Sequence, residues 1–166
     1  AWDENQPGKL IGGIDNSPDG SGKVLAAITG GGSDLFTEAT FGDIKLGVEF
    51  MLPKGSNSGI YLMGEYEVQV LDSYGKAADK LNMGDLGALY SAAAPKVNAA
   101  KKPGEWQRFE IDFRAPRFAD GKKTANAKFV RVVLNGTVLH ENVEMKGATP
   151  GGLTGKEAPA GPLMLQ

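Results

Sequence analysis

Two carboxylates and an amide, the side chains of Glu67, Asp72 and Gln69, lie close together along one short apolar segment. In a regular strand Glu67 and Gln69 share one face, whereas Val68 and Val70 point to the other. Asp72 joins the polar face only if a bulge or the end of the strand intervenes. We therefore predict that the three polar side chains share a solvent-accessible concave surface. Two carboxyl groups so placed suit acid–base chemistry on a sugar, with Glu67 and Asp72 as the catalytic pair.

Two interpretations of this segment stay open. If the carboxylates of Glu67 and Asp72 lie close together, their repulsion raises the pKa of one of them towards a value useful for proton transfer. The alternative is an ordinary half-exposed strand whose polar side chains point to water.

Aromatic side chains are the second candidate for sugar chemistry, because their rings can stack on the apolar C–H faces of a sugar. The candidates are Tyr61, Tyr66, Tyr74, Tyr90 and Trp106. Aromatic residues also fill the cores of β-sandwiches, so each of them has a purely structural alternative.

The sequence offers few side chains for metal or cofactor chemistry. The chain has no cysteine and one histidine, His140, which excludes thiol catalysis and argues against a zinc site. We expect His140 to have a surface or hairpin role, and we expect no cofactor. A calcium site formed by loop aspartates and backbone carbonyls stays open. The sequence contains no nucleophile-elbow, P-loop or dinucleotide-binding motif.

Length and composition describe the protein that must position these groups. The 166 residues fit one domain, residues 1–166, and a net charge of −2 argues against nucleic-acid binding through bulk charge. No apolar run approaches the roughly 20 residues that a membrane-spanning helix requires. The 24 glycines and 9 prolines are spread between short β-branched and aromatic runs. This pattern is typical of an all-β protein with many turns, and we predict a jelly-roll β-sandwich.

The expected elements are short strands separated by turns. Residues 1–22 are predicted to be mostly loop. Residues 75–104 are rich in alanine and glycine, and we expect them to form a long functional loop over the concave face, with a helical turn at 77–81. Asn135-Gly136 is a strong hairpin signal. Alternation or β-branched content predicts strands over residues 23–29, 44–52, 58–63, 66–72, 106–113, 127–134, 137–143 and 163–166. The predicted core comprises Val68, Val70, Phe109, Ile111, Val130, Val132 and Leu134.

An ordered series of motifs carries a family resemblance. The series is GSNSGIY at 55–61, YEVQVLDSY at 66–74, GALY at 87–90, KPGEW at 102–106, LNG at 134–136 and GPLMLQ at 161–166. Over residues 30–166 the chain closely resembles the 3-keto-disaccharide hydrolase domain family. The resemblance implies a concanavalin A-like jelly roll and, because such domains are common in exported bacterial proteins, a periplasmic or secreted location. It also implies that Asn57, Glu67, Gln69, Asp72, Tyr90 and Gln166 lie on or near the concave site.

The resemblance further implies a reaction. Family members are linked to cleavage of glycosides already oxidised at C3, where the ketone acidifies the C2 proton and allows elimination across C1–C2. The family's usual first strand segment, and the segment that follows the equivalent of Gln166, are absent from this sequence. Two alternatives to an enzyme therefore stay open. One is a non-catalytic carbohydrate-binding module, and the other is an accessory subunit of a larger extracytoplasmic or membrane-associated complex, with a protein partner at the unpaired sheet edges.

Overall fold

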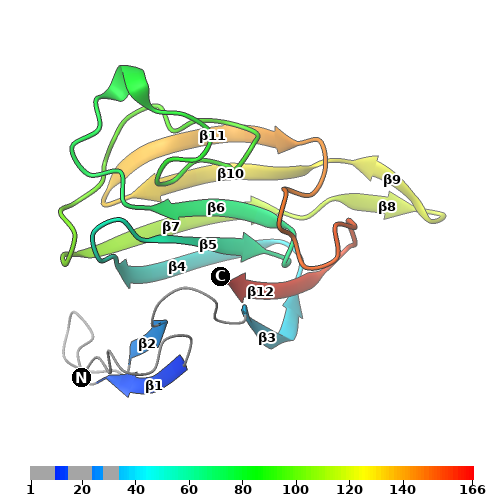
Figure 1. Ribbon diagram of the computed structural model, residues 1–166. Coiled ribbons are helices and arrows are strands. Elements are labelled where there is room, and N and C mark those ends of the chain that lie inside the picture. The colour runs from blue at the N-terminus through cyan, green and yellow to red at the C-terminus, as the bar shows by residue number, and fades with distance from the viewer. Residues whose placement is uncertain (1–9, 15–23, 28–33) are drawn as a thin grey trace. The chain divides into compact units, whose positions relative to one another are not determined.

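The computed structural model describes residues 10–14, 24–27 and 34–166 and is almost entirely β (Figure 1). Its contacts divide the chain into two units, Ala1–Leu35 and Phe36–Gln166. In the first unit, β1 (Leu10–Ile14) pairs antiparallel with β2 (Val24–Ala27). The prediction that residues 1–22 are mostly loop did not include β1. The other parts of that prediction lie outside the described residues.

The rest of the chain forms two four-stranded sheets of a jelly-roll β-sandwich (Figure 1). One sheet has the order β3-β12-β5-β6 and the other has the order β11-β10-β7-β4. The strands of the first sheet are β3 (Leu35–Phe41), β5 (Asn57–Leu62), β6 (Tyr66–Leu71) and β12 (Gly161–Leu165). Those of the second are β4 (Ile44–Met51), β7 (Trp106–Arg114), β10 (Ala127–Leu134) and β11 (Thr137–Met145).

The core between these sheets follows from alternation along the strands. On β7, Phe109, Ile111 and Phe113 are buried, while the residues between them point outward. The Phe113 ring packs against those of Tyr66 and Phe129, with centroids 5.3 and 5.0 Å away. The core prediction is confirmed for all its residues except Val130.

A bulge in β10 explains the exception. The pairing of β10 with β7 shifts between Phe129 and Arg131, so Val130 is the extra residue. The shift changes which residues face inward, and Phe129 is buried in the core in place of Val130. Alternation read from the sequence misses such a shift because it assumes an uninterrupted ladder.

Two hairpins use the same turn chemistry. Asn135 and Gly136 have φ values of 51° and 82° and connect β10 to β11, as predicted. Asp120 and Gly121 have φ values of 51° and 72° and connect β8 (Arg117–Ala119) to β9 (Lys122–Ala125), a hairpin that we did not predict. The Asp120-Gly121 pair is a sequence signal for a hairpin and could have predicted this one.

The segment 75–104 does not form a structureless loop. The helical turn expected at 77–81 is present as the 3-10 helix η1 (Ala78–Lys80). Farther along, a short stretch pairs with the outer edge of β6: Gln69 N donates to Ala88 O at 2.9 Å, and Gly87 N donates to Gln69 O at 2.8 Å. The segment therefore extends the sheet beside β6. No helix in the described part of the chain is long and apolar enough to cross a membrane.

Candidate active site

Six of the predicted site residues share one face of the sheet, the face opposite the core. Tyr61 on β5 is paired with Glu67 on β6, and Gly59 is paired with Gln69. Their neighbours Ile60 and Val68 belong to the core cluster, whereas Tyr61 and Glu67 do not. The alternation of strand side chains therefore directs Glu67 and Gln69 away from the core, as predicted.

The strands on either side of β5 and β6 complete this face. Leu165 is paired with Ile60 on the core side, so the next residue, Gln166, lies on the side of Glu67, and its N–H donates to Gly59 O at 3.0 Å. Beyond β6, Leu89 is paired with Val68 on the core side, which places Tyr90 on the side of Glu67. We call this surface the Glu67 face; its predicted site residues are Asn57, Tyr61, Glu67, Gln69, Tyr90 and Gln166.

Burial differs from the prediction. Tyr61, Glu67 and Gln69 are 1%, 3% and 5% exposed, so the centre of the face is not an open surface. Asn57 and Gln166 are exposed, and Tyr90 is half-buried. The predicted solvent-accessible surface is therefore wrong at its centre and holds only towards its margins.

The acidity of Glu67 differs from that of an ordinary glutamate. Burial raises the pKa of its carboxyl group, and a hydrogen bond with the Tyr61 side chain opposes this rise without cancelling it. A raised pKa was expected from repulsion by Asp72, but the physical cause is loss of solvent. The nearly closed setting of Glu67 therefore holds its proton more tightly than an exposed glutamate does.

The loop between β11 and β12 approaches the Glu67 face from one end; it is the orange segment in Figure 1. Thr149 Oγ1 accepts a hydrogen bond from Glu67 N at 3.1 Å and donates one to Glu65 O at 3.0 Å. A Cβ built on Gly151 would lie 2.9 Å from the Tyr61 hydroxyl oxygen. This loop therefore contributes to the burial of Tyr61.

Glu65 anchors the same loop and was not among the predicted residues. It is 4% exposed, and its carboxylate accepts hydrogen bonds from Thr154 N, Thr154 Oγ1 and Gly155 N at 2.6–2.9 Å. The partners lie far along the chain, so no local signal in the sequence pointed to this role. Glu65 belongs to the framework that holds the loop in place.

Asp72 does not join the Glu67 face. The pairing of β5 with β6 runs without a shift from Asn57–Leu71 to Leu62–Tyr66, so the bulge required by the prediction is absent. Instead the Asp72 carboxylate accepts hydrogen bonds from Gly55 N at 2.9 Å and Tyr74 N at 3.2 Å. These bonds hold two turns together at the end of the hairpin.

Three of the aromatic candidates lie elsewhere. Trp106 is on β7 in the other sheet, paired with Met51 and on the side away from the core. Tyr66 is a core residue whose hydroxyl donates to Glu157 Oε1 at 2.6 Å, and Tyr74 is 49% exposed in the turn after β6. The predicted grouping of Trp106 with Glu67 is therefore wrong, because Trp106 belongs to the other sheet.

His140 is buried rather than at the surface, with 2% exposure. Its Nε2 lies 2.8 Å from Gly87 O, and since a carbonyl oxygen only accepts, that nitrogen carries the proton. Burial lowers the pKa of His140, and this effect is larger than the opposing effect of the Gly87 hydrogen bond, which raises the pKa. His140 thus connects β11 to the stretch that pairs with β6.

Within the described ranges, no three His, Cys, Asp or Glu side chains gather closely enough to hold a metal ion. The calcium site stays an open alternative, as it was in the sequence, and no residue of the Glu67 face is assigned to a metal.

The comparisons with known proteins agree with this fold. Residues 2–166 match the model of the 3-keto-alpha-glucoside-1,2-lyase-like domain. No curated protein matches the chain. A crystal structure of a "putative glycosyl hydrolase" from Parabacteroides distasonis is 34% identical with a TM-score of 0.69, and the match covers 80% of this chain and 60% of that one. The chain thus spans less than two thirds of that relative's length.

Two further crystal structures from the same organism, described in the same words, support the fold alone. One is 21% identical with a TM-score of 0.55, and the match covers 80% of this chain and 74% of that one. The other is 16% identical with a TM-score of 0.54, and the corresponding shares are 80% and 67%. The family model and the more similar structure together confirm the resemblance seen in the sequence: this chain belongs to the 3-keto-alpha-glucoside-1,2-lyase-like domain family.

Proposed function

We propose that this protein cleaves glycosides oxidised at C3, with Glu67 as the group that transfers the proton. The observation that carries the proposal is the setting of Glu67. It is a buried carboxyl group with a raised pKa, beside Tyr61 and Gln69 on a polar sheet face. Membership of the 3-keto-glycoside family supports the substrate class.

The proposed chemistry needs one proton acceptor and one proton donor. The C3 ketone acidifies the C2–H bond, and the carboxylate of Glu67 takes this proton while the electron pair forms an enolate. Collapse of the enolate restores the ketone, forms the C1=C2 bond and breaks the C1–O bond, and the protonated Glu67 gives its proton to the departing oxygen. A carboxyl group whose pKa is raised towards neutrality is better matched to this exchange than an ordinary glutamate.

The other residues of the Glu67 face would bind the sugar. Exposure increases from Glu67 towards half-buried Tyr90 and exposed Asn57 and Gln166. We therefore expect the sugar to approach from these margins, with amides and the Tyr90 ring as the binding groups. Asp72 is not part of this proposal, since its carboxylate is occupied in a turn.

The test is turnover of a 3-keto-α-glucoside by the parent and by Glu67→Gln. A lost acid–base group typically costs about 100-fold or more in rate, and we expect a loss of that size. Glu141→Gln is the matched control, because Glu141 is exposed on β11 in the other sheet. A Glu67→Gln variant with the activity of the parent would contradict the assignment.

One observation favours a second function, that of a carbohydrate-binding module. The exposed amides of Asn57 and Gln166 and the half-buried ring of Tyr90 could bind a sugar without any proton transfer by Glu67. The same experiment separates the two. A folded parent that binds glycosides but turns over no 3-keto-glucoside would support the binding module.

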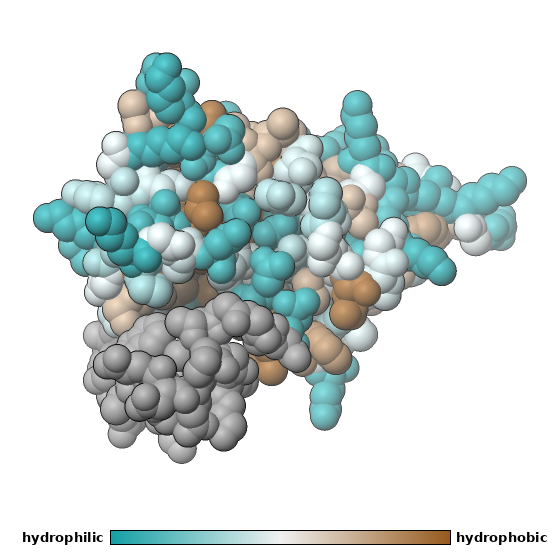
Figure 2. Space-filling view, in the orientation of Figure 1, coloured by the Kyte–Doolittle hydropathy of each residue, from teal (hydrophilic) through white to brown (hydrophobic). Residues whose placement is uncertain are grey.

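An accessory role with a protein partner also stays a prediction. β3 and β4 each end a sheet, and Phe36 on β3 is 57% exposed. The face seen in Figure 2 is mostly hydrophilic, with separate hydrophobic side chains rather than one broad apolar patch. Co-purification from the native host would test this role.

A further inference from the structure

The strand β4 alternates between an inner side that faces the core and an outer side that faces away from it. Its inner side chains pack against the core but stay half-buried; they are Ile44, Leu46, Val48 and Phe50. On β7, Phe109 and Ile111 are paired with two of these residues and are only 0% and 2% exposed. The core is therefore less completely covered along β4 than along β7.

β4 is also the end of its sheet. Among the described strands only β7 pairs with it, in the order β11-β10-β7-β4 (Figure 1). The pairing runs over all eight residues, Ile44–Met51, without a shift, and none of them is a proline. The backbone groups on the side away from β7 therefore form a regular row, which is the usual template for pairing with another strand.

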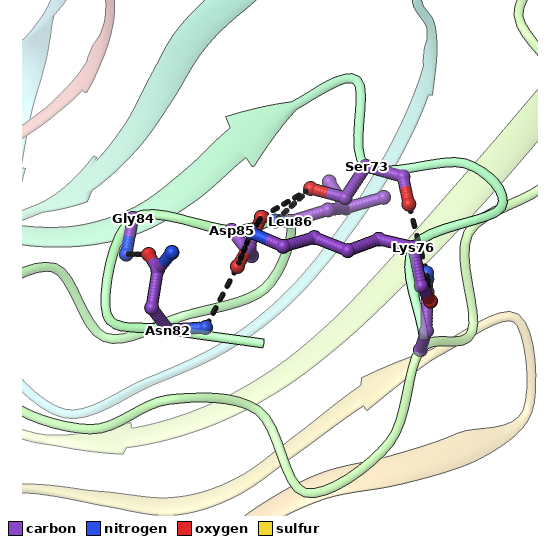
Figure 3. Close-up of polar contacts among 7 residues, drawn as sticks. Ser73, Lys76, Asn82, Gly84, Asp85 and Leu86 are labelled. Atoms are coloured by element: carbon purple, nitrogen blue, oxygen red, sulfur yellow. Dashed lines mark hydrogen bonds and ion pairs between the residues drawn. The ribbon is translucent and has the colours of Figure 1, made fainter. Parts of the chain in front are cut away.

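The end of the other sheet at β6 is not open in this way, because the stretch at 87–89 pairs with it. A buried carboxylate fixes the segment that leads into this stretch (Figure 3). Asp85 is 2% exposed and accepts hydrogen bonds from Ser73 Oγ at 3.0 Å, Lys76 Nζ at 2.7 Å and Asn82 N at 2.7 Å. This network ties the covering segment to the turn after β6.

The strands at the two remaining ends, β11 and β3, are less regular than β4. Asn142 in β11 has a φ of 54°, in the left-handed region, and the register with β10 shifts between Val132 and Val133. At β3, Leu163 N donates to the side-chain oxygen of Thr37, Oγ1, at 3.0 Å. Of the sheet ends in the described part of the chain, β4 is thus the best suited to strand addition.

The outer side chains of β4 complement a second copy of the same strand. Two antiparallel copies with Gly47 opposite the partner's Gly47 bring Lys45 opposite the partner's Glu49, and the reverse. Opposite charges at facing positions stabilise antiparallel pairs. The side chains of Lys45 and Glu49 are 86% and 42% exposed. They already contact Asp112 and Arg108 on β7, at 3.8 and 3.3 Å, so the new pairs would complete a row of alternating charge.

The inner side chains match in the same register. Leu46 faces the partner's Val48, and Ile44 faces the partner's Phe50, so apolar contact would cover side chains that one copy leaves half exposed. A shift of one residue would turn the apolar side of one copy outward. A shift of two would place Glu49 opposite Gly47 or Lys45 opposite Gly47. Charge and apolar contact therefore select one register.

We propose that this protein forms a symmetric dimer through antiparallel pairing of β4 with β4 of a second copy, which joins the two four-stranded sheets into one continuous sheet. The partner is a second copy because the strand is its own complement about Gly47. A single strand pair buries less than the roughly 1,200 Å² of a standard interface, so we expect association in the micromolar range. The inference is independent of the proposed catalytic function.

The first experiment exchanges the charges. Sedimentation equilibrium compares the parent with Lys45→Glu, with Glu49→Lys and with an equimolar mixture of the two variants. Each variant alone places like charges at both facing positions, and we expect association to weaken about tenfold or more. The mixture should associate again, because an acidic strand then faces a basic one. Ion pairs lost within one copy cannot explain this pattern, since mixing does not restore them.

Lys128→Glu is the matched control. It makes the same change of charge and breaks a cross-strand ion pair, with Glu144 at 3.4 Å. Lys128 lies on β10, which β7 separates from β4. We expect this variant to associate like the parent.

A second experiment uses the absence of cysteine from the chain. Gly47→Cys places one thiol of each copy at the centre of the junction, where facing Cα atoms lie about 4.5–5.5 Å apart, within reach of a disulfide. A Cβ at Gly47 meets only the flexible end of the Arg108 side chain, at 3.0 Å. Oxidation should link this variant into a covalent dimer much faster than Gly147→Cys, whose Cβ meets nothing within 4 Å.

A parent that stays monomeric throughout the micromolar range would overturn the proposal. Single charge variants that associate like the parent, or a mixture that does not associate, would overturn it as well. The melting temperatures of Lys45→Glu and Glu49→Lys show whether these variants are folded. If they are not, the rate at which Gly47→Cys is linked decides the question, and a rate no higher than that of Gly147→Cys would refute pairing through β4.

Discussion

The carboxyl group of Glu67 on β6 lies directly against the backbone of Gly59 on β5. A Cβ built on Gly59 would be 2.6 Å from Glu67 Oε1 and 2.7 Å from Tyr61 Cε2. Glycine at this position therefore makes the space that Glu67 and Tyr61 occupy. The burial of the Glu67 carboxyl group therefore depends on Gly59 and Tyr61 on β5 as well as on Glu67 itself on β6.

Substitution of Gly59 should consequently disturb both the site and the packing around it. We expect Gly59→Ala to displace Glu67 and Tyr61, to cost about 1–3 kcal/mol of unfolding free energy as overpacking does, and to reduce turnover of a 3-keto-glucoside. Gly147→Ala, in open space, should change neither. Urea denaturation and turnover assays measure both effects, and a Gly59→Ala variant with parental stability and activity would refute this packing argument.

The burial of Glu67 predicts a pH-dependent gain in stability for Glu67→Gln. Because the folded-state pKa of Glu67 lies above its unfolded value of 4.5, the fold favours the protonated form, and this contribution is lost as the pH rises through the folded pKa. The glutamine side chain of the variant carries no charge at any pH, so the variant should gain more stability over the parent at pH 8 than at pH 4. Melting curves at the two pH values measure the difference; an equal gain at both would mean that burial does not perturb Glu67.

Asp72 should behave as a turn residue. We expect Asp72→Asn to lower the unfolding free energy by about 1 kcal/mol, because it weakens the hydrogen bonds from Gly55 N and Tyr74 N. Turnover should stay close to that of the parent. A loss of activity comparable to that of Glu67→Gln, without a change in stability, would instead restore Asp72 to the catalytic role that the sequence suggested.

His140 should make the protein less stable in mild acid. Its folded-state pKa lies below the unfolded value of 6.5, so the unfolded chain binds the proton more readily. The contribution of neutral His140 is complete above pH 6.5 and declines as the pH falls towards the folded pKa. His140→Gln, whose amide can still donate to Gly87 O, should lose less stability than the parent between pH 8 and pH 5. Parallel curves for the two proteins would argue against a perturbed His140.

Most of the strands and their connections could be predicted from local patterns in the sequence. Alternation in β4 and β7 identified strand and core face, because a side-chain period of two places every second residue on the same side. Asn135-Gly136 marked its hairpin because both residues tolerate positive φ. The direction of Glu67 and Gln69, opposite to Val68 and Val70, followed from the same local rule.

What covers each face depends on contacts between distant parts of the chain. The burial of Glu67 depends on Gly59 across the hairpin and on the residues that close its face. The role of Glu65 depends on hydrogen bonds from a loop that lies far along the chain. The bulge at Val130 and the regular end of β6 at Leu71 were likewise undetermined, since a bulge is set by pairing with neighbouring strands. Local sequence fixes the direction in which a side chain points, but its solvation, and therefore the pKa of Glu67, is set by atoms brought to it from elsewhere in the chain.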